Sequence, residues 1–187
     1  KKELEKENLK VLEAGFANLD AHVGIVRKLG LPPVVAVNRF PTDTDREIDA
    51  VVEHGQDLGV RAAAHTAYRD GGQGMQDLAK LVLDAANHSA HAIRFTYKED
   101  DPFEEKVAKI AMEIYGAASV KYNAAALDDL ERLANAGLDH LPVCIAKTQL
   151  SLTADENQRG APKGWTLEVR NVRASAGAGF LVVICGD

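Results

Sequence analysis

Aromatic and amide side chains follow two predicted strands of this 187-residue sequence. Ligands bind beyond the carboxyl ends of parallel strands, because the loops diverge there and leave a crevice. Two aromatic rings at such an edge could stack on both faces of a flat heterocycle, at about 1–3 kcal/mol per ring. An amide could also donate to and accept from the edge of that ring. The candidate binding residues are Asn38, Phe40, Pro41, Tyr68, Gly71 and Gly72.

An ordinary structural role competes with this interpretation. Loop aromatics usually pack on helix ends, so periodicity alone favours that role for Phe40 and Tyr68. We expect Gly71 and Gly72 to adopt backbone conformations that are closed to side chains. We expect Phe40 and Tyr68 to face each other across a gap that suits one aromatic ring.

The elements that position these residues are those of an α/β fold with a mainly parallel sheet flanked by helices. VVAVN (34–38) is apolar on both faces, as a central parallel strand is. Thr44 and Glu47 form a capping box that begins a helix through Leu58, which Gly59 ends. Further strands are predicted at 60–68, 92–97, 119–122, 141–147, 165–175 and 179–187, and further helices at 9–29, 77–86, 102–115 and 124–136.

The composition argues against nucleic-acid-binding, membrane-spanning and metal-binding functions. The formal charge of -6 and the pI near 5.5 disfavour a nucleic-acid partner, which requires clustered Lys and Arg. We find no run of the roughly 20 apolar residues that a membrane helix requires. The six histidines lack ligand spacing, so we expect no metal site. Cys144 and Cys185 lie in apolar runs and are predicted to be buried thiols in a reducing cytoplasm.

The chain is predicted to be part of a larger multidomain protein. It begins without Met inside a predicted helix and stops directly after a predicted strand. We expect two α/β domains, residues 1–95 and 96–187. A non-catalytic α/β module for oligomer contacts or regulation is the alternative to an enzyme fragment.

Several ordered segments carry a family resemblance: NLDAHVGIVRKLGLPPVVAVNRFPTDTDREI, AYRDGGQGMQDLA, YGAASVKYNAAALDDL, GLDHLPVCIAKTQLSL and RASAGAGFLVVICGD. Together they resemble formate-tetrahydrofolate ligase along essentially the whole chain. The resemblance implies a fold related to P-loop ATPases with additional α/β domains. It implies an enzyme that activates formate with ATP and magnesium to formyl phosphate, then formylates N10 of tetrahydrofolate. Residues 1–95 would be the C-terminal part of the nucleotide- or folate-binding domain, and we expect a cytoplasmic homo-oligomer.

The resemblance also assigns the aromatic residues. It implies that Phe40 and Tyr68 line a slot for a planar ring, either pterin or adenine; we favour pterin, although Asn38 would suit adenine. The family pattern has Trp where this chain has Tyr68, which reduces stacking area but keeps a π face. No G-x-x-x-x-G-K-[ST] motif occurs in the sequence. We therefore expect no catalytic residue and no cofactor held by this segment alone, and an inactive isolated chain that depends on a missing N-terminal part.

Overall fold

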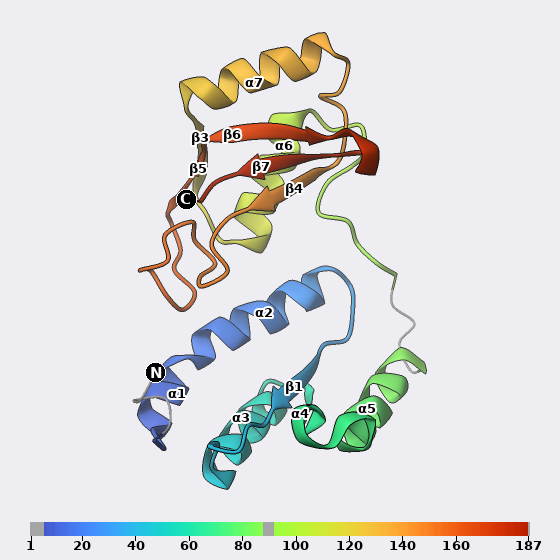
Figure 1. Ribbon diagram of the computed structural model, residues 1–187, viewed down its shortest axis with the longest axis vertical. Helices are drawn as coiled ribbons and strands as arrows, with labels where there is room; N and C mark the ends of the chain where they lie inside the picture. Colours follow the sequence, from blue (N-terminus) through green and yellow to red (C-terminus); the bar gives the residue numbers. More distant parts are fainter. Residues whose placement is uncertain (1–5, 88–91, 187) are drawn as a thin grey trace. The chain divides into compact units, whose positions relative to one another are not determined.

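The computed structural model describes residues 6–87 and 92–186. The chain divides into two compact units, Lys1–Arg94 and Phe95–Asp187. Both units combine helices with parallel strand pairs, so the predicted α/β class is confirmed (Figure 1). The functional identity of the two predicted domains stays a prediction.

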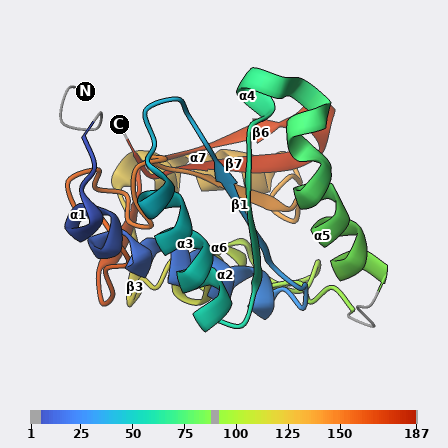
Figure 2. The same ribbon diagram turned by 90° about the horizontal axis from the view of Figure 1, so that it is seen from below.

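The first unit holds one parallel strand pair in its described part. β1 and β2 are in register from Val34 opposite Arg61 to Asn38 opposite His65. Helices α3 and α5 lie on opposite sides of β1 in both views (Figure 2). The elements in order are α1 (Leu9–Ala14), α2 (Phe16–Lys28), β1 (Val34–Asn38), α3 (Asp45–Asp57), β2 (Arg61–His65), α4 (Ala67–Asp70), η1 (Gly71–Met75) and α5 (Gln76–Asn87).

A small apolar core fixes β1 against its helices. Val23 of α2, Val35 of β1 and Val60 are buried together. The predicted capping box is confirmed at the start of α3, where the Thr44 hydroxyl accepts from the Glu47 N–H. Because the cap satisfies N–H groups that have no partner within the helix, it fixes where the loop after β1 ends.

The second unit holds two sheets in its described part, β3-β5 and β4-β7-β6. The β3-β5 and β4-β7 pairs are parallel and the β6-β7 pair is antiparallel. Helix α7 runs beside β6 (Figure 1). The elements in order are α6 (Phe103–Lys109), η2 (Ile110–Ile114), β3 (Ser119–Tyr122), α7 (Ala124–Asn135), β4 (Val143–Ala146), β5 (Thr166–Val169), β6 (Asn171–Ser175), η3 (Ala176–Ala178) and β7 (Phe180–Ile184).

Two predicted strands were wrong in type or length. Residues 92–97 form no strand, because their polar groups bind elsewhere: the Arg94 N–H donates to the Leu29 carbonyl, and the Tyr97 hydroxyl accepts from the Val143 N–H. The strand predicted over 60–68 ends at His65, so Tyr68 lies in the short helix α4. The β1 strand was predicted to be covered on both faces, but Ala36 is exposed in the described structure.

The second unit departs from prediction at a helix and at a cysteine. The helix predicted over 102–115 turns into a π-helix, in which the Tyr115 N–H donates to the Ile110 carbonyl five residues back. Phe103, Val107 and Ala111 are buried at four-residue spacing, whereas Ile114, at the end of the π-helix, is only partly buried. Cys144 is exposed, because neighbouring strand residues point to opposite faces and Val143 takes the core face. Cys185 is buried as predicted, and burial raises the pKa of its thiol to about 12.

Candidate functional site

The candidate site begins where β1 and β2 end side by side. Asn38 and His65 are opposite each other in the parallel register. One further bond continues the pairing, from the Arg39 N–H to the His65 carbonyl at 3.0 Å. The loops that follow the two strands therefore leave the sheet at the same edge, as the sequence predicted.

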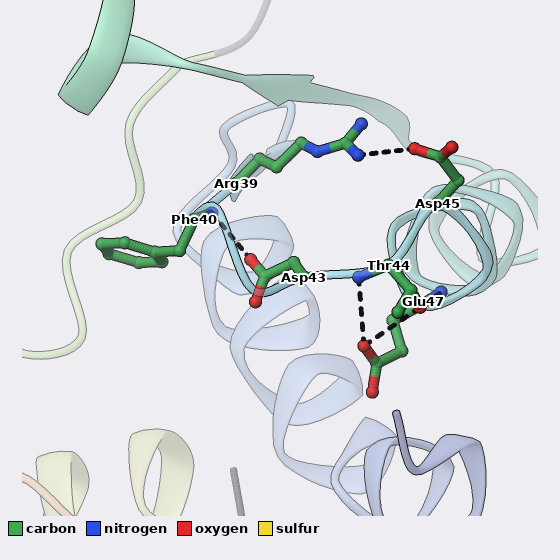
Figure 3. A network of polar contacts seen from close by, with 6 residues as sticks. All are labelled: Arg39, Phe40, Asp43, Thr44, Asp45 and Glu47. Carbon is green, nitrogen blue, oxygen red and sulfur yellow. Dashed lines mark hydrogen bonds and ion pairs between the residues drawn. The ribbon is translucent and has the colours of Figure 1, made fainter. Parts of the chain in front are cut away.

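The loop after β1 is a tight turn held by its own polar groups (Figure 3). The Phe40 N–H donates to Oδ2 of Asp43 at 2.8 Å, and the Asp43 N–H donates to the Phe40 carbonyl at 3.1 Å. Arg39 forms an ion pair of 2.6 Å with Asp45 at the start of α3. The ring of Phe40 points away from this network, which leaves it available for contact with a ligand.

The loop after β2 folds back onto the strand end. The Thr66 N–H donates to the Gly74 carbonyl at 3.1 Å, and the Thr66 hydroxyl donates to Oδ2 of Asp70 at 2.6 Å. Arg69 forms an ion pair with Asp70 at 2.9 Å. These bonds close a compact loop around the helix that carries Tyr68.

The charge on Asp70 is favoured by its neighbours. Hydrogen bonds from Arg69, and then from Thr66, lower the pKa of the Asp70 carboxyl to about 2. The same pairing raises the pKa of Arg69. Asp70 is therefore ionised at every physiological pH and keeps both partners bound.

The two aromatic rings touch each other. The ring centroids of Phe40 and Tyr68 are 5.9 Å apart, with an angle of 47° between their planes. Both rings are open to solvent, at 44% and 76% exposure. They border a cavity of about 270 Å³ lined by Arg39, Phe40, Pro41, Thr66, Tyr68 and Arg69.

This geometry corrects the predicted gap. Carbon atoms pack at about 3.5 Å, so a ring held between two others needs their planes to be parallel and about 7 Å apart. The tilted contact of Phe40 and Tyr68 is direct and leaves no such gap.

Three of the predicted residues, Phe40, Pro41 and Tyr68, line the cavity. Asn38, Gly71 and Gly72 do not. Gly71 has the predicted special conformation, with φ of 57° and ψ of -138°. The prediction for Gly72 was wrong: its φ is not positive, and a Cβ placed on it would meet no atom within 4 Å.

Sequence reasoning missed the glycine that the loop requires. A Cβ on Gly74 would lie 2.5 Å from the Thr66 hydroxyl and 2.8 Å from the Thr66 carbonyl. Gly74 is the third glycine of RDGGQGM, whereas the prediction concerned only the adjacent pair, Gly71 and Gly72. The contributions of Arg39, Thr66 and Arg69 to the cavity could be inferred only from their place after the strands.

A second polar cavity, of about 450 Å³, lies beyond the end of β4. The ammonium group of Lys147 donates to the carbonyls of Thr148, Ser151 and Thr153. It also lies 4.9 Å from the centre of the Tyr115 ring. Burial lowers the pKa of Lys147. Because this ammonium is already bound by its own loop, Lys147 serves first to order residues 148–153.

Within residues 6–87 and 92–186, no three His, Cys, Asp or Glu side chains gather as a metal site would require. No described helix is both long and apolar enough to cross a membrane.

Comparisons with known proteins give a consistent likeness. A family model described as formate-tetrahydrofolate ligase matches residues 1–187. Curated proteins of that name are similar to this chain: one from Haloquadratum walsbyi is 48% identical over 99% of the chain. One from Nocardioides is 49% identical over 99%, and one from Pseudothermotoga lettingae is 44% identical over 100%.

These relatives are much longer than the sequence described. The chain covers 32%, 34% and 33% of the lengths of those three proteins. It therefore corresponds to about a third of each relative.

Proposed function

This chain belongs to the formate-tetrahydrofolate ligase family, and we propose that it is part of an ATP-dependent ligase that formylates tetrahydrofolate at N10 through formyl phosphate. Formate, ATP with magnesium, and tetrahydrofolate are the proposed substrates. The remaining two thirds of the protein would supply the phosphate-binding loop. A fold related to P-loop ATPases, a cytoplasmic location and a homo-oligomeric state belong to the same proposal.

We assign to the first unit the surface that binds a planar substrate ring. The observation that carries this assignment is the pair of exposed, adjacent rings, Phe40 and Tyr68, at the carboxyl edge of two parallel strands. Exposed aromatic side chains supply stacking area of about 1–3 kcal/mol per ligand ring. Pro41 borders the same cavity, and Gly71 shapes the turn that follows Tyr68.

Binding requires one of the two rings to rotate. Tyr68 is the more exposed, at 76%, and side-chain rotations of this kind are common when ligands bind. Turning Tyr68 parallel to Phe40 would open the space between them for one planar ring. We therefore propose that the slot forms as the ligand enters.

Pterin is the ring that we assign to this slot. The Asn38 amide was the feature that favoured adenine, and Asn38 does not line the cavity. The cavity is flanked instead by Arg39 and Arg69, whose guanidinium groups can donate to the carbonyl and ring-nitrogen acceptors of a pterin.

The test uses Phe40→Ala and Tyr68→Ala in the full-length enzyme, with apparent affinities for tetrahydrofolate and ATP measured separately. Each variant should weaken tetrahydrofolate binding by roughly ten- to a hundredfold and leave ATP binding unchanged. Phe95→Ala is the matched control, because it removes an exposed ring outside the cavity lining. A loss confined to ATP would reassign the slot to adenine. Unchanged affinity for both substrates would return Phe40 and Tyr68 to a structural role and favour a non-catalytic module.

A second experiment tests whether the 187 residues catalyse alone. The sequence holds no phosphate-binding motif of the G-x-x-x-x-G-K-[ST] type, whose backbone and lysine stabilise charge on transferred phosphate. The isolated chain should therefore show no formate-dependent ATP hydrolysis and no formyl transfer. Robust turnover from the purified chain would contradict the proposal that the rest of the protein supplies the phosphate-binding loop.

A further inference from the structure

A third cavity lies in the first unit, at the edge of the β1-β2 pair opposite the aromatic site, where the two strands begin. Its volume is about 670 Å³, within the range of small-ligand sites. Its lining includes three arginines, Arg27, Arg61 and Arg94, together with the Gln56 amide, and no acidic residue of the described chain lines it. Three arginines therefore gather at this cavity although the chain as a whole has a net charge of -6.

Arg27 lines the cavity, and its guanidinium is held in place by two backbone carbonyls. One of its guanidinium nitrogens donates to the carbonyls of Leu58 and Gly59, at 2.6 and 3.3 Å, just beyond the end of α3. Carbonyls are neutral partners, so they orient the guanidinium but do not balance its charge. Its remaining donors are available to an anion.

Arg94 is brought to the cavity by its backbone. Its N–H donates to the Leu29 carbonyl at 2.9 Å. The neighbouring Gly30 has φ of 79°, and a Cβ there would lie 2.3 Å from the Ala92 carbonyl. The absence of a side chain at Gly30 thus lets residues 92–94 pack against the turn after α2. The Arg94 guanidinium forms no ion pair with another described residue.

Arg61 is the only one of the three whose charge is balanced in the described part of the chain. It forms an ion pair with Asp84 of α5, which does not line the cavity. Among the described residues, the positive charges on Arg27 and Arg94 therefore have no acidic partner.

We propose that this cavity binds a dianionic oxyanion of the phosphate type, either free or as part of a small phosphorylated molecule. Guanidinium groups match the oxygens of phosphate with paired hydrogen bonds and keep their charge at all working pH values. Two uncompensated arginines match the two charges of such a group, and the volume leaves room for more than the phosphate itself.

The anion site is separate from the aromatic site. β1 and β2 each span five residues between the two edges, which places the sites about 15 Å apart at roughly 3.3 Å per residue. An anion bound here would contact the starts of the strands whose ends carry Phe40 and Tyr68. Its binding could therefore change the positions of the loops that carry Phe40 and Tyr68 without competing for the ligand of those two rings.

The test is titration calorimetry of inorganic phosphate into the full-length enzyme, with its substrate sites saturated by tetrahydrofolate and a non-hydrolysable ATP analogue. The wild type should bind one phosphate per chain. Arg94→Gln should weaken that binding at least about tenfold, because it removes a charged hydrogen-bonding partner. Arg27→Gln should weaken phosphate binding to a similar extent. Arg94→Lys should weaken it less, because lysine keeps the positive charge but cannot form the paired hydrogen bonds of a guanidinium.

Arg46→Gln is the control, since Arg46 is a surface arginine that pairs with Glu7 outside the cavity. It should bind phosphate as the wild type does. Unchanged affinity of the ATP analogue will show that each variant is folded. Phosphate binding of equal strength in wild type and Arg94→Gln would overturn the proposal. A wild type that binds no phosphate would overturn the proposal as well.

Discussion

The Thr66 hydroxyl donates a 2.6 Å hydrogen bond to Asp70, so the end of β2 is tied to the helix that carries Tyr68. Asp70→Asn should loosen this tie, because it removes the charged acceptor that both Thr66 and Arg69 use. We expect a several-fold loss of tetrahydrofolate affinity in the full-length enzyme, measured by steady-state titration. Asp77→Asn is the control, because Asp77 forms an ion pair with Lys80 at a highly exposed position and does not line the cavity. Equal losses in both variants would contradict a specific role for Asp70.

The lowered pKa of Asp70 fixes the pH range of this contact. The pKa falls from 3.8 to about 2 in the folded protein, so the stabilising contribution is complete above the unfolded value and is lost as pH falls through about 2. Carbon-13 NMR of the Asp70 carboxyl should give a midpoint of about 2, so its signal should change little between roughly pH 3.5 and roughly pH 5, where an ordinary aspartate with a pKa of about 3.9 titrates. A midpoint near or above 4 would mean that the contacts of Arg69 and Thr66 with Asp70 do not persist in solution.

Tyr68→Trp should preserve or modestly improve ring binding. An indole offers a larger stacking face than a phenol, and the 76% exposure of Tyr68 leaves room for it. We expect tetrahydrofolate affinity in the full-length enzyme to be equal to or a few-fold tighter than that of the wild type. The new indole should also change its fluorescence when tetrahydrofolate binds. A tenfold weaker affinity would mean that the Tyr68 hydroxyl, rather than its ring face, contacts the ligand.

The three glycines of the second loop should respond differently to alanine. Gly74→Ala places a Cβ against the Thr66 backbone, and Gly71→Ala forces a side chain into a conformation that costs about 1–3 kcal/mol. Both should lower tetrahydrofolate affinity and the thermal midpoint. Gly72→Ala meets open space and should leave both quantities unchanged. The three variants can be compared by calorimetry and steady-state titration. If Gly72→Ala lowered the affinity and the thermal midpoint as much as Gly74→Ala, the predicted difference between these glycines would be refuted.

Thr44→Ala should weaken the start of α3. Loss of an N-cap hydroxyl typically costs about 1 kcal/mol, which corresponds to roughly fivefold faster opening. Hydrogen exchange in the full-length enzyme should show this loss of protection at the amide of Glu47, which donates to Thr44. Thr42→Ala, in the same loop but outside the cap, should leave exchange unchanged.

Sequence patterns predicted the structure correctly where residues close together in the sequence determine it. The Thr44–Glu47 box and the parallel β1-β2 pair depend on neighbouring residues or on strand periodicity, and both are confirmed. Phe40 and Tyr68 were placed at one edge for the same reason.

Prediction failed where distant contacts decide. The segment 92–97 has strand-like composition, yet it lacks a strand partner because Arg94 binds the turn at Leu29. The need for glycine at position 74 arises from Thr66, eight residues earlier along the chain, and cannot be inferred from the glycine spacing. The tilt between Phe40 and Tyr68 is likewise set by two separately folded loops.

The strand order of the second unit has a consequence for how the protein emerges during synthesis. β7 is the middle strand of the β4-β7-β6 sheet and the last strand of the described chain. β4 and β6 therefore have no common partner until the ribosome has added residues 180–184. Contacts between residues far apart in sequence also slow folding, because the intervening chain must first be closed into a loop. During translation both described strands of the first unit are complete after residue 65, whereas the three-stranded sheet of the second unit is complete only after residue 184.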